Sequence, residues 1–170
     1  IIMASGASPI VPDVASAITV PVLTSDSIWS LQALPQRLLV VGGGALGCEM
    51  AQAFRRLGSQ VVLVEASFRL VAREEPEVSE ELEASLAKEG IEILCNARFN
   101  GQRPTGQMEI LTSGNESEGL LVDVDAVLFA LGRTPTLDAK TQETLRFSLG
   151  RGGSLQVNES LQTDYPNIYG

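Results

Sequence analysis

The feature that most constrains the fold is a cluster of glycines between two short apolar runs. The chain reads RLLVVGGGALG from residue 37 and SQVVLVE from residue 59. Each apolar run has the length of a buried strand, and the residues between them place apolar side chains at helical spacing. The pattern predicts a strand at 37–41, a helix at about 45–57 and a second strand at 60–64.

The following residues continue this alternation of strand and helix before the pattern changes. Pro76 suits the first turn of a helix that Gly90 ends, and the apolar run at 91–94 predicts a third strand. Residues 98–124 hold short strand-like pieces that predict an antiparallel meander, and 126–132 predicts a buried strand that returns to the sheet. Together these elements predict an α/β fold with a parallel sheet, helices on both faces and an antiparallel β-meander as one crossover.

Three glycines in the cluster form the pattern G-x-G-x-x-G between a strand and a helix. Gly42 allows the tight turn out of the strand, Gly44 lets a pyrophosphate approach the backbone, and Gly47 lets the helix pack closely on the strand. The helix N-terminus then offers free N–H groups and a partial positive charge to the phosphates. In this context the pattern predicts a dinucleotide site on a Rossmann-like sheet, with a purely structural glycine turn as the alternative.

A carboxylate at the end of the second strand predicts which dinucleotide is bound. Glu65 lies 18 residues after Gly47, where it can accept hydrogen bonds from the adenosine ribose and repel a 2′-phosphate. Arg69 could in principle receive that phosphate, but no second basic residue stands beside it. We therefore expect NAD(H) to be preferred over NADP(H), with Arg69 in a structural or solvent-facing role.

Composition excludes several classes of function. A net charge of −9 disfavours nucleic acid and anionic membranes as partners, and no apolar run approaches the length of a membrane span. The chain has no histidine, which removes the commonest general base and metal ligand. Its two cysteines, Cys48 and Cys95, lack metal or redox spacing and are expected to be buried free thiols. We expect no metal site and a cytoplasmic location.

Three segments together resemble the flavoprotein disulfide reductases. This family of pyridine nucleotide-disulfide oxidoreductases includes dihydrolipoamide dehydrogenase, glutathione reductase and mercuric reductase. The segments are VVGGGALGCEMAQAFRRLGSQVVLVE, DAVLFALGRTPTL and the closing VNESLQTDYPNIYG. The resemblance covers essentially the whole chain and is specific for the family but not for one member. It implies an NAD(H) domain inserted between two halves of an FAD domain, in a homodimeric parent enzyme that ends with a dimerisation domain.

The same resemblance implies the domain organisation. MASGASPIVP is similar to the segment where the first FAD half ends, and NIYG is similar to the approach to the glycine-aspartate flavin motif. Residues 1–25 would be a stub of the FAD domain and a linker, 26–148 the NAD(H)-binding domain, and 149–170 the returning stub of the FAD domain. The start lacks an initiator Met, so we expect the chain to be an excised piece of its parent.

The resemblance also assigns site residues by position. Glu49 matches a residue at the nicotinamide–flavin junction with a supporting role in hydride transfer, where it pairs with a Lys of the FAD domain. Ala45 stands where many relatives have a large residue, so it cannot gate the nicotinamide pocket. Ala97 matches a position near the adenine, and Gly132 one on the nicotinamide side. The residues expected to bind NAD are Gly42, Gly43, Gly44, Ala45, Leu46, Gly47, Glu49, Glu65, Ala97 and Gly132. Those expected at the FAD are Ser5, Gly6 and Ala7.

These features predict that the chain presents NADH for hydride transfer to the flavin of an FAD-dependent pyridine nucleotide-disulfide oxidoreductase. The chain alone is expected to bind nucleotide but to be inactive, because the redox cysteine pair and the acid-base dyad of many members lie outside it. Two alternatives are a stand-alone domain that senses NAD(H) and the cofactor domain of a dehydrogenase without flavin. The electron acceptor, whether a disulfide, lipoamide, mercuric ion or quinone, is chosen by parts outside the chain.

Overall fold

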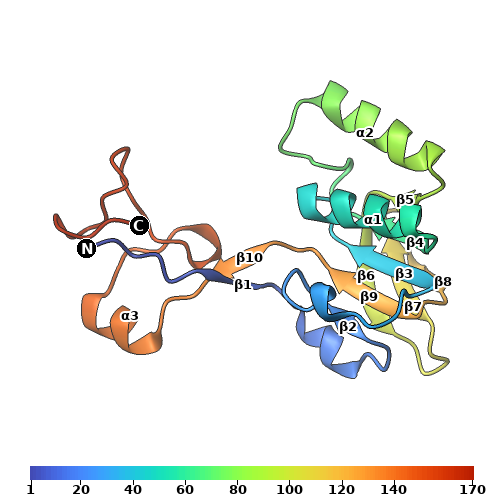
Figure 1. Ribbon diagram of the computed structural model, residues 1–170, viewed down its shortest axis with the longest axis horizontal. Helices are drawn as coiled ribbons and strands as arrows, with labels where there is room; N and C mark the ends of the chain where they lie inside the picture. The colour runs from blue at the N-terminus through green and yellow to red at the C-terminus, as the bar shows by residue number, and fades with distance from the viewer. The chain divides into compact units, whose positions relative to one another are not determined.

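Residues 11–131 and the remainder of the chain form two separate units. The computed structural model describes residues 1–170 apart from the side chains of 115–118, 139 and 151. The smaller unit combines residues 1–10 with 132–170. Figure 1 labels the elements of both units. The larger unit contains the whole of the parallel sheet.

That sheet has five strands, all paired in parallel. Their order is β2 (Val22–Leu23), β9 (Ala126–Phe129), β3 (Arg37–Val41), β4 (Gln60–Val64) and β5 (Glu92–Leu94). At its centre, Leu39 of β3 lies in register between Val62 of β4 and Val127 of β9. The central strands consist almost entirely of Val, Leu and Phe because both faces of the sheet are covered. The strands predicted at 37–41 and 60–64 are confirmed.

Both long helices pack on one face of this sheet (Figure 1). α1 (Ala45–Leu57) follows directly from the glycine cluster and ends at Gly58, whose φ of +112° lies in the left-handed region that favours glycine. α2 (Pro76–Lys88) has its proline in the first turn, as the sequence predicts. Leu86 of α2 is buried in the same apolar cluster as the inward residues of α1, β3 and β4.

The opposite face of the parallel sheet is covered by a second, antiparallel sheet. Its strands pair in the order β6 (Ala97–Gln102), β7 (Met108–Thr112) and β8 (Asn115–Val122). Ile110 packs against the parallel sheet, and the rings of Phe99 and Phe129 meet edge to face at 5.6 Å. The 3-10 helix η1 (Asp13–Ala17) buries Ala15 in the same cluster.

The predicted α/β class, the parallel sheet and the antiparallel meander are confirmed. The two faces differ in their cover, since α1 and α2 lie on one and η1 with the antiparallel sheet lies on the other. The reason is the connection from β5 to β9, which is the meander itself. Its apolar side chains fill the space that a second crossover helix would otherwise take.

In the smaller unit, two short strands far apart in the sequence pair with each other. β1 (Ala7–Pro9) runs antiparallel to β10 (Arg133–Pro135). α3 (Ala139–Leu145) begins after Asp138, whose carboxylate accepts a hydrogen bond from the Thr141 N–H at 2.9 Å. The remaining short helices are η2 (Ile28–Ser30), in the larger unit, and η3 (Arg151–Gly153). Among the described residues, every helix falls short of the length and apolar character that a bilayer span requires.

Candidate nucleotide-binding site

The glycine turn joins the carboxyl end of β3 to the start of α1. Gly42 has a φ of +111°, and a Cβ there would lie 2.5 Å from the carbonyl oxygen of Ala130. The Gly42 N–H donates to the carbonyl of Val64 at 2.8 Å. Position 42 therefore requires glycine for two reasons, its left-handed backbone and the close approach of the neighbouring chain.

The other two glycines of the pattern have opposite surroundings. A Cβ at Gly47 would overlap the carbonyl oxygen of Gly42, so the helix approaches the turn more closely than any side chain allows. A Cβ at Gly44 would meet nothing within 4 Å, and Gly44 is exposed. Gly47 is thus needed for packing, whereas Gly44 leaves open space over the backbone, as an approaching ligand requires.

The first N–H groups of α1 have no acceptor among the described residues. They belong to Gly44, Ala45, Leu46 and Gly47. The first hydrogen bond of the helix runs from the Cys48 N–H to the Gly44 carbonyl at 3.0 Å. Because the N-cap residue is a glycine, it offers no side chain to these donors. Unpaired N–H groups at the positive end of a helix favour the binding of an anion.

The carboxylate of Glu65 is hydrogen-bonded to the turn itself. Its Oε2 accepts from the Gly43 N–H and its Oε1 accepts from the Ser67 N–H, each at 2.6 Å. The sequence predicts Glu65 as a ligand of the ribose and gives no sign of these two contacts. A carboxylate has about four acceptor positions, so about two stay available to a ligand.

Gly43 is also enclosed, although the glycine pattern allows any residue at this position. A Cβ there would lie 2.5 Å from Cδ2 of Leu70 and 2.8 Å from Cβ of Glu65. The Gly43 carbonyl accepts a hydrogen bond from the Val71 N–H at 2.8 Å. The loop after β4 is therefore fastened to the glycine turn through both backbone polar groups of one residue.

A cavity of about 330 Å³ opens beside the turn, at the carboxyl ends of β3 and β4. It brings together three of the predicted residues, Gly42, Glu65 and Ala97. Sequence reasoning missed the rest of its lining, which includes Pro12, Val14, Ala66, Arg98, Phe99, Phe129 and Leu131. These residues belong to no motif, and only their place next to predicted strand ends could have indicated them. The size and the mainly apolar lining suit part of a nucleotide.

Arg69 is held by its own loop. Its Nη2 donates to the carbonyl oxygens of Ala72 at 3.1 Å and Glu74 at 2.8 Å. The guanidinium lies 5.3 Å from the centre of the Phe68 ring. Its Nε is buried and has no hydrogen-bond acceptor in the described part of the chain. The donors of Arg69 thus face the protein, in keeping with a structural role.

Glu49 and Ala45 lie on the exposed side of α1. The Glu49 carboxylate forms no hydrogen bond or ion pair with any described residue. Its side chain is therefore available to a ligand or to another part of the protein.

The two cysteines are free thiols, as predicted. Cys48 is buried as expected, whereas Cys95 is only half-buried. The Cys48 thiol donates to the Gly43 carbonyl at 3.5 Å. Burial, and then the charges of nearby glutamates, raise the pKa of each thiol to about 11. Both are protonated at neutral pH. Within the residues that the structure describes, no group of three or more His, Cys, Asp or Glu side chains could hold a metal ion.

The other predicted site residues lie in the smaller unit. Gly132 has a φ of +94°, and its carbonyl accepts a hydrogen bond from the Ile10 N–H at 3.0 Å. Ser5 and Gly6 precede β1, in which Ala7 pairs with β10. The division into two units places these residues in a different unit from the glycine turn, and their roles at the nicotinamide and the flavin stay predictions.

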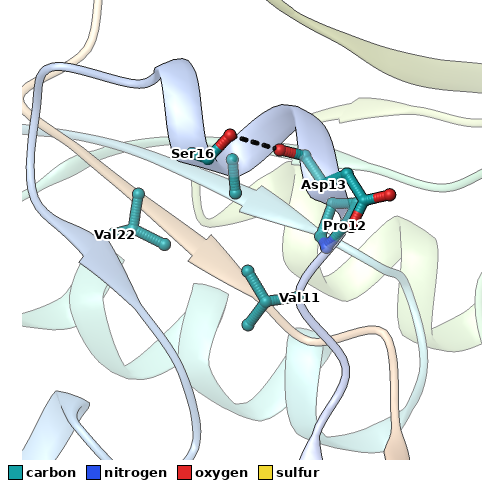
Figure 2. A pocket seen from close by; sticks show the side chains of 6 residues that line it. Val11, Pro12, Asp13, Ser16 and Val22 are labelled. Atoms are coloured by element: carbon teal, nitrogen blue, oxygen red, sulfur yellow. Dashed lines mark hydrogen bonds between the residues drawn. The ribbon is translucent and has the colours of Figure 1, made fainter.

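A second pocket, of about 580 Å³, lies along η1 and β2 (Figure 2). Val11, Pro12 and Val22 give it an apolar lining, and the Ser16 hydroxyl donates to the Asp13 carbonyl at 2.8 Å. None of the predicted site residues lines it. The smaller cavity, which is lined by Glu65 and by Gly42 of the glycine turn, is the better candidate for a nucleotide.

Comparisons with known proteins bear on the family of the chain. The family model described as pyridine nucleotide-disulphide oxidoreductase matches residues 1–170. The mercuric reductase of Staphylococcus aureus is 33 % identical over 168 residues, which are 99 % of this chain and 31 % of that protein. The dihydrolipoyl dehydrogenase of Bacillus subtilis is 34 % identical over 169 residues, or 99 % of this chain and 36 % of that protein.

A solved structure gives the same result. The HOCl-induced flavoprotein disulfide reductase RclA of Escherichia coli matches with a TM-score of 0.80 at 27 % identity, over 99 % of this chain and 38 % of that chain. The chain thus spans between 31 % and 38 % of the length of the relatives described above.

Proposed function

Because the chain belongs to the pyridine nucleotide-disulphide oxidoreductase family, we propose that it is the NAD(H)-binding domain of an FAD-dependent oxidoreductase. In this role it holds NADH and presents the nicotinamide to the flavin of the parent enzyme. A family match over residues 1–170 favours this role over an NAD(H) sensor or a dehydrogenase without flavin.

The observation that supports nucleotide binding most strongly is the pairing of free donors with free space. Four successive N–H groups, those of residues 44–47, have no acceptor among the described residues. The position that a Cβ of Gly44 would take is empty to 4 Å. A pyrophosphate needs both features, because its oxygens must come within hydrogen-bond distance of the backbone.

We further propose that NADH is preferred over NADPH. Glu65 lines the cavity, where its free acceptor positions suit ribose hydroxyls and its charge opposes a 2′-phosphate. The Nη2 of Arg69 already donates to the carbonyls of Ala72 and Glu74. Arg98 also lines the cavity, and its positive charge would attract a 2′-phosphate. The preference for NADH therefore requires that the repulsion by Glu65 exceed this attraction.

The residues of this chain bind and orient, while NADH supplies the hydride. The N–H groups of residues 44–47 fix the pyrophosphate, and Glu65 with the backbone of Ala97 fixes the adenosine. Glu49 and Gly132 are proposed to contact the nicotinamide side. Ser5, Gly6 and Ala7 are proposed to lie at the FAD.

The remaining expectations belong to the same proposal. Residues 26–148 are proposed as the nucleotide domain, 1–25 as a stub of the FAD domain with a linker, and 149–170 as the returning stub. The linker includes β2, which pairs with β9 in the parallel sheet. The parent enzyme is a cytoplasmic homodimer whose electron acceptor is set by its other parts.

Calorimetric titration of the purified protein with NADH, and separately with NADPH, tests the proposal. We expect tighter binding of NADH. Gly44→Val should weaken both nucleotides because its side chain fills the space over the turn. Thr105→Val, in the exposed turn before β7, is the control and should leave both affinities unchanged. Equal or tighter NADPH binding would refute the cofactor preference, and no binding of either nucleotide would refute the function.

A further inference from the structure

Glu65 makes two hydrogen bonds that a ribose ligand does not need. We propose that Glu65 is also the positioning residue of the phosphate-binding turn, holding that turn in its binding conformation before any nucleotide arrives. This inference rests on the proposed nucleotide site and adds a second role for one of its residues.

Three hydrogen bonds form what we name the turn brace. The Gly43 N–H donates to Oε2 of Glu65 at 2.6 Å, and the Ser67 N–H donates to Oε1 at 2.6 Å. The Val71 N–H donates to the Gly43 carbonyl at 2.8 Å. One carboxylate therefore links the turn after β3 to the loop after β4.

The turn needs such a restraint because of its composition. Residues 42–44 are three glycines in succession, and glycine has more backbone freedom than any other residue. Gly43 is buried, so its N–H would lose water without gaining a partner if Glu65 were absent. A carboxylate acceptor forms a stronger hydrogen bond than a neutral one, which makes Glu65 an effective restraint.

The brace also divides the donors of the turn into two sets. The Gly43 N–H is used by Glu65, whereas the N–H groups of residues 44–47 are unpaired. Holding Gly43 fixes the direction in which those four donors point. Affinity for the phosphates should then depend on Glu65 even when no ribose hydroxyl is present, because preorganisation lowers the cost of binding.

Glu65→Gln separates the two roles of this residue. Glutamine has the same shape, but only one of its two terminal atoms accepts a hydrogen bond. Its NH₂ group would face the N–H of either Gly43 or Ser67, two donors against each other, so the brace must open. The same glutamine can still hydrogen-bond to ribose hydroxyls.

The test compares ADP with 2′,3′-dideoxy-ADP, which keeps the phosphates and lacks both ribose hydroxyls. For Glu65→Gln we expect both ligands to bind about tenfold more weakly than to the wild type, the loss of roughly one charge-assisted hydrogen bond. A loss confined to ADP would overturn the inference, since it would mean that Glu65 acts on the ribose alone. Glu83→Gln is the matched control, because Glu83 accepts the Leu70 N–H at 2.8 Å in the same loop without touching the turn.

A measurement without ligand tests whether Glu65 restrains the turn, independently of the proposed function. Amide hydrogen exchange, followed by NMR, should be at least about tenfold faster at Gly43 and Ser67 in Glu65→Gln than in the wild type. Sheet amides such as that of Leu39 should be unchanged, which shows that the variant is folded. Unchanged exchange at Gly43 would overturn the inference. Should the wild type bind no nucleotide, the proposed function fails and the exchange result still tests the brace.

Discussion

Glu65 and Glu109 are carboxylates in similar positions that are held by different kinds of donor. Each lies against a glycine whose missing side chain makes room for it. A Cβ at Gly43 would lie 2.8 Å from Cβ of Glu65, and a Cβ at Gly119 would overlap Cγ of Glu109. Among the described residues, the donors to Glu65 are backbone N–H groups, whereas those to Glu109 are side chains.

The consequence of this difference is where the negative charge can act. Glu109 is 4 % exposed, accepts from Asn100 at 2.7 Å and forms an ion pair with Arg103, so its charge is neutralised inside the antiparallel sheet. Glu65 has no ion-pair partner among the described residues and lines a cavity. A carboxylate held by neutral backbone donors keeps its negative charge available to a ligand. The type of donor therefore distinguishes the ligand-facing Glu65 from the structural Glu109 better than burial does.

The largest effect should come from filling the space beside Glu65. In Gly43→Ala the new methyl group would press on Leu70 and on Glu65, which should lower the free energy of unfolding by about 1–3 kcal/mol. NADH affinity should fall sharply at the same time. Gly119→Ala should lower stability but leave NADH affinity unchanged. Urea unfolding measures the stability and calorimetry measures the NADH affinity. A similar loss of NADH affinity in both variants would show that the two carboxylates do not differ in their role at the ligand.

A smaller effect is expected on removing the cation beside Glu109. Arg103→Leu leaves that carboxylate buried without its ion pair, so the urea midpoint should fall while NADH affinity stays constant. Arg37→Leu is the control, because it breaks an ion pair with Asp125 whose side chains are 45 % and 38 % exposed. If both variants lose equal stability, burial of Glu109 has no energetic importance.

The free energy of unfolding should fall at acidic pH, in part because Glu109 becomes protonated. The hydrogen bond from Asn100, followed by Arg103, lowers the pKa of Glu109 below its ordinary value. A lowered pKa stabilises the fold above the unfolded pKa of ~4.3, and this contribution is lost as the pH falls through the folded pKa. Glu109→Gln should therefore flatten the fall of the urea midpoint below about pH 4.5. An unchanged slope would show that other carboxylates account for it.

The smallest effect concerns thiol reactivity. With pKa values of about 11, Cys48 and Cys95 should react slowly with a disulfide reagent at pH 8 in the folded protein. Because the Cys48 thiol donates to the Gly43 carbonyl, Glu65→Gln should give a small increase in its rate. Glu109→Gln should give none. Mass spectrometry of the labelled protein assigns each rate to its residue, and a faster Cys48 in Glu109→Gln would contradict the separation of the two regions.

The strands and helix around the glycine turn could be predicted because their signals are local. Apolar runs, helical spacing and Gly58 at the helix end are all read within a short stretch, and the structure has β3, α1 and β4 where the sequence predicts them. The position of Glu65 at the end of β4 follows from the same local pattern.

The contacts of Glu65 could not be predicted in this way. The Gly43 position is unspecified in the glycine pattern, and its hydrogen bond to Glu65 depends on the path of two loops that only the folded sheet brings together. The cavity residues Arg98 and Phe99 come from β6, a strand of the antiparallel sheet that connects β5 to β9. Such lining residues carry no periodic signal, so no motif could indicate them.

The position of β9 between β2 and β3 has a consequence for folding during synthesis. β3 emerges from the ribosome well before β9, so one of its edges is paired only when residues 126–129 follow. Until then the strand RLLVV exposes unpaired backbone and apolar side chains, which is the state in which chains associate wrongly. The Gly42 turn likewise acquires its neighbour Ala130 only at that point. Nascent chains that end before β9 therefore have an incomplete sheet edge, at which wrong association is expected.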